Sequence, residues 1–261
     1  NMKQPTQKLT YSPANAKLRK LAKAHSIRPW LADGRKVYSL DLLSGWSCPF
    51  AKDCLSKVHV GADGRRSVVD GPDTEWRCFD TSQEAVYPSV YNMRLRNFDI
   101  LRQAKTTGAM LDCLTATFPE RCGVLRVSVA GDIFNPHYFR AILELARLNP
   151  DVLFYAYTKS LRYWIADRAR VRRLDNLVLT ASYGGRDDDL ISRHRLRYAK
   201  VVLSTYQARQ ERLPIDSDDS HAADPNRSRQ SFALLIHGTQ PSGSKAQKAV
   251  KRLAGLGSYT R

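Results

Sequence analysis

Leu125-Arg126-Val127-Ser128-Val129-Ala130-Gly131-Asp132 has the pattern of a buried β-strand that ends in a glycine-containing turn. Residues 136–148 follow with apolar side chains at helical spacing, so strand and helix form one βα unit. The same order recurs toward the C-terminus, with strands expected at residues 152–157, 177–181, 200–204 and 231–236 and a last helix at residues 245–253. This alternation predicts a parallel sheet with helices on its faces.

The rest of the chain extends this α/β pattern. Residues 37–42 alternate like a short strand, and residues 87–118 have helical character. Residues 209–230 form a polar insertion, which we expect to be a mobile loop. The sequence therefore predicts a single α/β domain at residues 37–261, preceded by a basic extension at residues 1–36.

The charge of the chain is concentrated at its two ends. The 261 residues carry a net charge of +17, and residues 1–36 hold nine basic residues against one acidic residue. Residues 226–261 hold seven basic residues and no acidic one. The electrostatic field of these positive charges attracts polyanions, so nucleic acid is a candidate partner of the basic termini. Solubility, or a counterweight to an anionic cofactor or substrate, is the plainer alternative.

The composition also bears on where the protein acts. No apolar run approaches the roughly 18 residues of a membrane span, and no signal-peptide pattern opens the chain, so we expect no membrane partner. The cysteine count of 5 is odd. Without a secretory signal this argues against a disulfide framework and for a reducing compartment.

Polar residues stand at the carboxyl end of each predicted strand. They are Gly131, Asp132, Tyr157, Lys159, Ser182, Ser204 and His237. Because the carboxyl ends of parallel strands meet at one edge of a sheet, these residues are expected to face one pocket. Plainer roles stay open for each residue. Asp132 or Ser204 could cap a helix, Lys159 could be paired or exposed, and His237 could be structural.

Three cysteines, Cys48, Cys54 and Cys78, lie in loop-like sequence with aromatic neighbours. Asp63-Gly64 stands between two β-leaning runs and predicts a hairpin that returns Cys78 to the side of Cys54. Three thiols on loops suit an iron–sulfur cluster or a zinc site. Three unrelated buried cysteines are the alternative, since the spacing Cys-x5-Cys-x23-Cys is not a standard metal-binding pattern.

The neighbours of these cysteines also carry charge. Metal binding needs thiolates, and we expect the basic residues Lys52, Lys57 and Arg77 to favour that form. The other two cysteines differ from these three. Cys113 is interpreted as a small apolar core residue, whereas Cys122 lies in a turn before a strand and its role is open.

Several longer runs of the chain resemble one known family. They are Thr74–Phe79, Tyr87–Val90, Val127–Phe134, Phe154–Leu161, His237–Pro241 and Gly257–Tyr259. These runs resemble the bacteriophage family known as the gene-88 product, and the likeness extends from about Ser39 to the C-terminus. The family is similar to radical S-adenosylmethionine (radical SAM) enzymes. The resemblance therefore implies a partial (βα) TIM-like barrel with a cysteine-bearing loop and hairpin region in its N-terminal part.

The resemblance also implies a [4Fe–4S] cluster held by the same three cysteines, with S-adenosylmethionine as a further cofactor. In radical SAM enzymes a short acid-containing turn after the next strand receives the amino group of S-adenosylmethionine, and residues 130–132 occupy that place here. Lys159, Ser182 and Ser204 would bind the carboxylate or ribose, with Tyr157 in the same cofactor site. His237 would lie near the substrate, and Lys159 and His237 are the expected catalytic residues. The usual Cys-x3-Cys-x2-Cys loop is absent from this chain.

Three functions compete at this point. The first is a radical SAM-like enzyme that acts on an unknown substrate in the cytoplasm of a phage-infected host. The second is a non-catalytic iron–sulfur protein that binds nucleic acid or regulates in response to redox state. The third is a zinc-dependent or metal-free hydrolase, which would be colourless.

Overall fold

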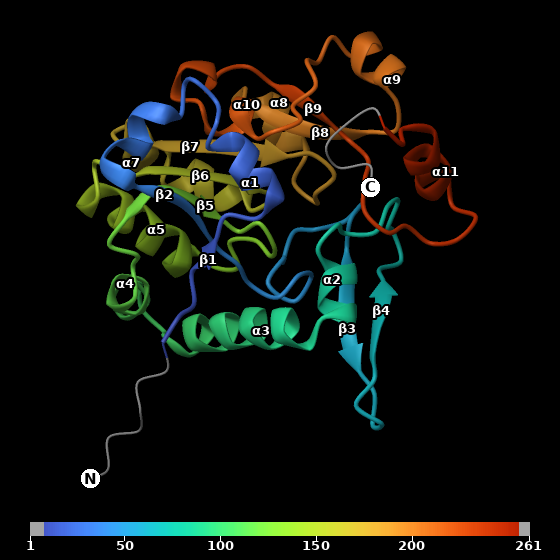
Figure 1. The fold of residues 1–261 in the computed structure, drawn as a ribbon, viewed down its shortest axis with the longest axis horizontal. Coiled ribbons are helices and arrows are strands. Elements are labelled where there is room, and N and C mark those ends of the chain that lie inside the picture. Colours follow the sequence, from blue (N-terminus) through green and yellow to red (C-terminus); the bar gives the residue numbers. More distant parts are fainter. Residues whose placement is uncertain (1–7, 256–261) are drawn as a thin grey trace.

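The core of the fold is a seven-stranded, mostly parallel sheet, seen in a computed structural model that describes residues 8–255 (Figure 1). Its strands, in spatial order, are β1 (Ser12–Pro13), β2 (Lys36–Leu40), β5 (Cys122–Val127), β6 (Leu153–Thr158), β7 (Leu177–Ser182), β8 (Tyr198–Val202) and β9 (Phe232–Leu235). Every neighbouring pair from β2 to β9 is parallel, whereas β1 pairs antiparallel with β2. The predicted α/β class with parallel strands is confirmed.

Helices connect the strands and cover the sheet. They are α1 (Ala16–Leu21), η1 (Arg28–Gly34), α2 (Thr81–Val86), α3 (Pro88–Gln103), α4 (Thr107–Ala116), α5 (Pro136–Leu148), α6 (Leu161–Ala166), α7 (Arg168–Val171), α8 (Asp189–His194), α9 (Thr205–Gln210), α10 (Ser220–Ala223), η2 (Pro225–Arg227) and α11 (Lys245–Arg252). Local sequence explains where helix α5 begins. Helix α5 starts where the Asn135 side chain accepts a hydrogen bond from the Tyr138 N–H, with Pro136 in its first turn.

The sheet is open and does not close into a barrel. Strands β1 and β9 form its two edges and are not paired with each other in the part of the chain that the structure describes. Helices α4, α5 and α6 pack on one face. The opposite face, which would line a barrel, is covered by Leu18 and Leu21 of α1 and by Ala222 and Ala223 of α10. Because these helices fill that space, the sheet is the middle layer of a three-layered structure.

A separate two-stranded hairpin, β3 (Ser56–Val60) and β4 (Arg66–Asp70), precedes α2 and projects from the body beside it (Figure 1). Its two strands are antiparallel, and Gly64 in the connecting turn has a φ of 76°. A left-handed conformation of this kind favours glycine. The hairpin predicted from Asp63-Gly64 is thus confirmed.

The polar insertion at residues 209–230 is more ordered than the sequence predicts. It contains α10 and η2, and Ile215 forms a bridge to Ala233 beside the sheet. Asp216 is 1% exposed and Asp219 is fully buried. The segment therefore contains helical turns where the sequence predicts only a loop, and the ion pairs of Asp219 link it to α1 and to the sheet.

The basic N-terminal segment also packs onto the body from residue 8 onward. Lys17 of α1 forms an ion pair with Asp219 at 2.5 Å, and Arg126 of β5 pairs with the same carboxylate at 2.7 Å. The phenol groups of Tyr155 and Tyr157 donate hydrogen bonds to it at 2.9 and 3.0 Å. One carboxylate thus joins α1, the sheet and the insertion.

One of the runs that resemble the gene-88 product, Gly257–Tyr259, lies outside the described residues 8–255. Within the described residues, no helix has both the length and the apolar character needed to cross a membrane.

Replacing Asp219 tests how much this ion cluster stabilises the fold. The Asp219→Asn variant leaves Lys17 and Arg126 without their shared countercharge, so its free energy of unfolding should fall by about 3 kcal/mol. Asp151→Asn is the matched control, because Asp151 is 80% exposed and its pair with Arg35 is 4.0 Å long, so it should change stability by at most about 0.5 kcal/mol. Urea unfolding measures both, and equal effects would contradict the role assigned to Asp219.

Candidate functional site

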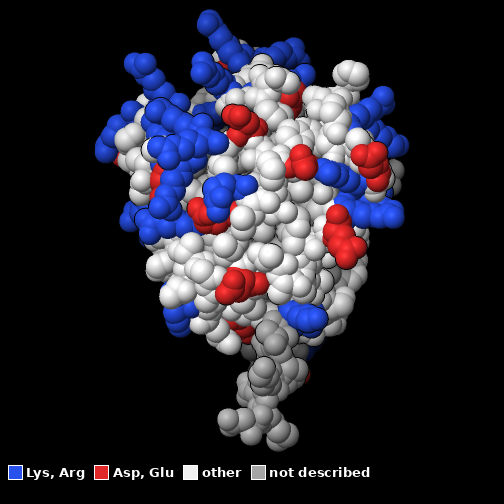
Figure 2. Space-filling model, turned by 90° about the vertical axis from the view of Figure 1, so that its left-hand side faces the viewer, with Lys and Arg blue, Asp and Glu red and all other residues white. Residues whose placement is uncertain are grey.

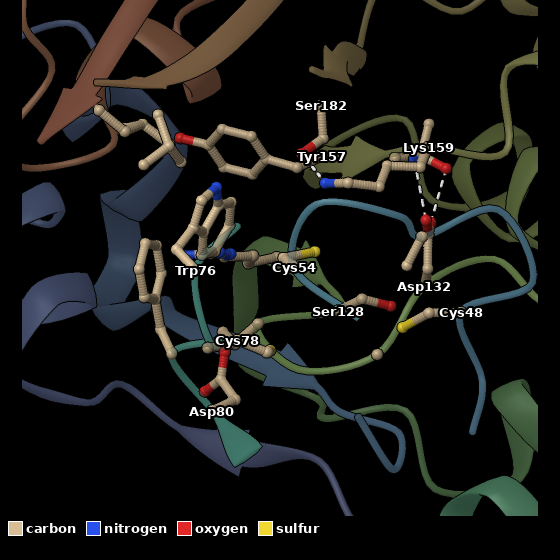
Figure 3. A pocket seen from close by; sticks show the side chains of 18 of the residues that line it. Cys48, Cys54, Trp76, Cys78, Asp80, Ser128, Asp132, Tyr157, Lys159 and Ser182 are labelled. Atoms are coloured by element: carbon tan, nitrogen blue, oxygen red, sulfur yellow. Dashed lines mark hydrogen bonds between the residues drawn. The ribbon is translucent and has the colours of Figure 1, made fainter. Parts of the chain in front are cut away.

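A pocket of about 140 Å³ opens at the carboxyl ends of strands β5 to β9 (Figure 3). That volume is roughly ten times the space that one enclosed water needs on the same measure. Its wall contains most of the residues expected at the site, namely Cys48, Cys54, Cys78, Gly131, Asp132, Tyr157, Lys159, Ser182 and His237. Polar strand ends and cysteine loops therefore meet in one cavity.

The first cysteine loop is anchored to the turn after β7. The Asp53 N–H donates to the Gly184 carbonyl at 2.9 Å, and Ala51 forms an antiparallel bridge with Gly185. A side chain at Gly184 would meet the Asp53 carboxyl group at 3.0 Å, so close packing as well as hydrogen bonding joins these segments. These contacts hold the loop that contributes Cys48 and Cys54 to the pocket wall.

The hairpin and the turn after β9 position the third cysteine. The Cys78 N–H donates to Ser56 Oγ at 3.3 Å, so the chain returns beside Cys54 as the sequence predicts. The Gln240 amide donates to the Arg77 carbonyl at 3.0 Å and accepts from the Arg77 N–H at 2.7 Å. Cys78 is thus held between the hairpin and the β9 end of the sheet.

The three thiols offer the donor chemistry of a metal site but not the arrangement around one ion. Among residues 8–255, no group of three or more His, Cys, Asp or Glu side chains is arranged to hold a metal ion. The three thiols line one cavity, and thiolates are ligands both of zinc and of iron–sulfur clusters.

Burial disfavours the thiolate form of Cys48 and Cys78. It raises the pKa of Cys78 to about 12 and raises the pKa of Cys48 well above its usual value, with Asp80 and Asp132 adding to the effect. The expectation that basic neighbours favour the thiolate is wrong for these two cysteines. Arg77 is paired with Asp70 at 2.7 Å instead. Metal binding at this site must therefore displace protons.

The other two basic residues that are near the cysteines in sequence, Lys57 and Lys52, also contact other groups. The Lys57 ammonium lies over the Trp46 ring, 4.5 Å from its centroid. The Lys52 side chain is 51% exposed and lies 4.0 Å from the Asp53 carboxylate. Neither lysine lines the pocket.

Asp132 is a buried acid that joins two strand ends. Its carboxylate accepts hydrogen bonds from Thr158 Oγ1 at 2.6 Å and from the Lys159 N–H at 2.8 Å. Burial raises its pKa in spite of these bonds. Asp132 does not cap a following helix, because α5 is capped by Asn135. The carboxylate braces the β5 and β6 ends while lining the pocket.

Lys159 places an ammonium group inside the pocket. Its Nζ donates to Ser182 Oγ at 2.6 Å, which joins the ends of β6 and β7 (Figure 3). Burial lowers the pKa of Lys159, but Cys54 and Asp132 outweigh burial and leave the pKa above its usual value. The side chain therefore stays charged at neutral pH, beside the cysteine loop.

His237 belongs to an aromatic wall. Its ring lies 3.5 Å from that of Phe79, which stacks on Trp76 at 4.8 Å. Its Nδ1–H donates to the Leu235 carbonyl at 3.0 Å. Burial lowers the pKa of His237 to about 4, so the ring is neutral and a weak base at neutral pH.

Three further residues that the sequence pattern singled out lie outside the pocket wall. Ser204 does not line the pocket. Its hydroxyl accepts from the Gln207 N–H and caps α9, which is the plainer role considered for it. Cys113 packs at the edge of the main core on α4, and Cys122 is buried at the start of β5.

The structure adds pocket residues that the sequence reasoning did not select. Lys17 of α1, Arg126 of β5 and the stacked rings of Trp76 and Phe79 all line the cavity. Arg126 carried a signal in the sequence, because an arginine within an apolar strand needs a buried partner. That partner, Asp219, is 93 residues away and could not be identified from the strand itself.

The fold and the pocket define an open α/β protein with a cysteine-lined cavity at the strand ends. The chain belongs to the family described as "Gene product 88", which matches residues 6–254, so the predicted family is confirmed. It is 30% identical over 170 residues to the Gene 88 protein of Mycobacterium phage L5 and 27% identical over 170 residues to that of Mycobacterium phage D29. Each alignment covers 62% of this chain and 61% of the relative. No solved structure matches the chain.

A side chain at Gly131, in the wall of the pocket, would clash with its surroundings. Its φ is 81°, and a Cβ atom would lie 2.4 Å from Ser47 Oγ and 2.8 Å from the Leu42 Cβ. Gly131→Ala should therefore lower the free energy of unfolding by about 2 kcal/mol. In the control Gly108→Ala, nothing lies within 4 Å of the added Cβ in α4, so stability should rise by up to about 1 kcal/mol. Thermal unfolding compares the two, and an unchanged Gly131→Ala melting temperature would refute the close approach.

Proposed function

We propose that this protein binds a [4Fe–4S] cluster through Cys48, Cys54 and Cys78 and uses the adjoining pocket for radical S-adenosylmethionine chemistry in the cytoplasm of the infected host. The main support for the proposal is that three cysteines, spread over residues 48–78 of the chain, all line one cavity at the strand ends. When bound, a cluster of this kind supplies one electron to S-adenosylmethionine, which then provides a radical that abstracts hydrogen from a substrate.

The residues around the cavity support binding of a cofactor with amino, carboxylate and ribose groups. Asp132 presents a buried carboxylate beside Cys48, and its negative charge suits an amino group. Lys159 and Ser182 form a hydrogen-bonded pair that suits a carboxylate or a hydroxyl group. Tyr157 and Gly131 complete that side of the wall. Ser204 is left out of the proposed set because it caps α9.

The strand arrangement supports the same proposal. Parallel strands β5 to β9 all present their carboxyl ends to the cavity, as the strands of a (βα) barrel do. We interpret the open sheet as the partial barrel implied by the likeness to radical SAM enzymes, with α1 and α10 filling its inner side. In this interpretation Lys159 holds charge near the cysteines, and His237 contacts the substrate as a neutral ring.

Anaerobic reconstitution with iron and sulfide tests the cluster. The wild-type protein should become brown and absorb at about 400 nm, because thiolate-to-iron charge transfer gives iron–sulfur proteins their colour. Cys48→Ala, Cys54→Ala and Cys78→Ala should each lose most of that absorbance. Cys113→Ala is the matched control, since Cys113 lies away from the pocket on α4.

Two outcomes would reject the cluster. One is a wild-type protein that stays colourless after reconstitution, which would favour a zinc or metal-free hydrolase. The other is a triple alanine variant that binds as much iron as the wild type. For the second step, reduced reconstituted protein mixed with S-adenosylmethionine should form 5′-deoxyadenosine. An intact cluster with no such product would leave an iron–sulfur protein that is not a radical enzyme.

A second candidate function, nucleic-acid binding, is favoured by one surface. Lys and Arg side chains gather on the face that contains η1 and α7 (Figure 2). Trp30 of η1 lies with Arg147 and Arg173 around one surface hollow, so these segments adjoin. We call this surface the basic face and define it by Arg147 and Arg173 at this hollow, together with Arg28 and Arg172, the exposed arginines close in sequence to Trp30 and Arg173.

The basic face differs from the partner site expected at the two termini. Its residues come from the N-terminal segment and from residues 147–173, whereas α11 in the C-terminal segment lies on the other side of the molecule (Figure 1). Phosphate contacts by Lys and Arg need no particular base sequence. We therefore propose that non-specific binding, if this is the function, uses the basic face.

Salt titration of DNA binding tests this second function. If the basic face contacts phosphates, the affinity should fall steeply with salt, and Arg172→Ala/Arg173→Ala should lower the slope of log K against log salt by about 1 to 2. Lys251→Ala/Arg252→Ala on α11 is the charge-matched control and should keep the wild-type slope. Gel-shift measurements at several salt concentrations give these slopes. No shift at low salt, or equal slopes in both variants, would end this alternative.

A further inference from the structure

The surface hollow on the basic face has a volume of about 350 Å³ and is separate from the cysteine-lined pocket. We call it the Trp30 hollow, and its wall contains Trp30, Arg147, Arg173, Leu174, Asp175 and Asn176. None of these residues lines the cysteine-lined pocket. Small-molecule sites have volumes of roughly 300–1,000 Å³, so the hollow is large enough for one flat ring system.

The fold forms this hollow through contacts between distant segments. A Cβ atom at Gly123 of β5 would collide with the Trp30 carbonyl oxygen, so η1 packs directly on the backbone of that strand. The Arg35 side chain, just after η1, donates to the Asp151 carbonyl at 2.7 Å. The Asn176 Nδ2 lies 2.9 to 3.0 Å from three carbonyl oxygens of residues 146–152. Because the hollow is already formed, a ligand binds without the cost of ordering it.

The indole ring of Trp30 is available for stacking. Among the described residues it has no ring or cation partner, and its Nε1–H donates no hydrogen bond. Trp46, in contrast, has the Lys57 ammonium over its ring and donates to a backbone carbonyl. Trp76 stacks on Phe79. A half-buried indole without such partners suits a planar, aromatic ligand.

Basic side chains outnumber acidic ones beside the hollow. Residues 168–173, which contain α7 and lead to Arg173, include four arginines and no acidic residue. Neither Arg172 nor Arg173 forms an ion pair in the described part of the chain. Asp175 is the acidic residue of the wall, and Arg147 is paired with an acidic residue of its own helix at 2.8 Å, so we assign neither a role in anion binding. The two unpaired arginines favour a ligand that carries phosphate groups.

Asn176 adds a hydrogen-bond acceptor to the wall. Its Nδ2 binds backbone carbonyls, whereas its Oδ1 accepts no hydrogen bond from the described residues. The Watson–Crick edge of a nucleobase carries N–H groups that such an acceptor can bind. A flat ring with N–H groups, joined to phosphates, is a nucleotide.

We propose that the Trp30 hollow binds one unstacked base of a single-stranded nucleic acid, with the base against the Trp30 ring and the adjoining phosphates on Arg172 and Arg173. In a duplex each base is covered by its neighbours, so a ring in a hollow reaches the face of a base only in a single strand. The proposal rests on the nucleic-acid function of the basic face and names the kind of nucleic acid that this face binds. It does not depend on the iron–sulfur cluster.

Fluorescence anisotropy of the full-length protein tests this site, with a labelled oligothymidylate of about 10 nucleotides and a blunt duplex of the same length as probes. At equal salt the wild type should bind the single strand more tightly, although the duplex has the higher density of phosphates. Phosphate contacts alone would give the opposite order. An oligouridylate of the same length compares RNA with DNA, and the dependence on Trp30 should hold for both, because the ring contacts the base.

Substitutions of Trp30 separate stacking from folding. Trp30→Ala should weaken the single strand about 10-fold, which is within the range for loss of one stacking ring, and should leave duplex affinity and the salt slope unchanged. Trp30→Phe keeps a ring and should recover most of the affinity. Trp46→Ala is the matched control, because Trp46 is 44% exposed and lies outside the hollow. Arg173→Ala should instead lower the salt slope for the single strand by about 0.7.

The results separate failure of this site from failure of the basic face. No binding of either probe at low salt would end both proposals. A duplex that binds as tightly as the single strand, or Trp30→Ala with the single-strand affinity of the wild type, would overturn the Trp30 site alone. Equal losses of single-strand and duplex affinity in Trp30→Ala would show a structural role for Trp30 and would overturn the site as well.

Discussion

A single buried carboxylate, Asp219, holds together parts of the chain that are far apart in sequence. It pairs with Lys17 and Arg126 and accepts hydrogen bonds from Tyr155 and Tyr157. Burial alone would raise its pKa, but Arg126 and Lys17 outweigh burial and lower the pKa to about 2. Because the charge is compensated, the polar insertion and α1 can both rest on the inner face of the sheet. Because α1 and the polar insertion cover this face, the sheet does not curl around a central space as a barrel does.

The same interaction shapes the pocket. The two cations that bind Asp219 and the cysteines of the loops all line the cavity. The loops are held by a backbone hydrogen bond to the turn after β7 and by the Gln240 side chain in the turn after β9. A cavity of this kind offers thiols, a buried acid, a lysine and an aromatic wall within one enclosure.

Local patterns predicted much of the fold. The helix at residues 136–148 agrees with α5 residue for residue, because its apolar spacing, Asn135 cap and Pro136 all act within one segment. The hairpin around Gly64 and the polar strand ends were equally readable, since turn chemistry and strand patterning are local. Residues 209–230, expected to be a loop, contain α10 and η2, because the charges of this polar segment find partners far away in the sequence.

The sequence by itself determined the α/β class, the family and the set of polar strand ends, because periodicity, turn residues and longer motifs are properties of neighbouring residues. Only the tertiary structure decided that the sheet stays open, that Ser204 caps a helix outside the pocket and that Lys17 and Arg126 line it. These outcomes depend on contacts between residues far apart in sequence, and on burial, which raises the pKa of Cys48 and Cys78 despite nearby basic residues. Neither long-range pairing nor burial is encoded in any short stretch of the chain.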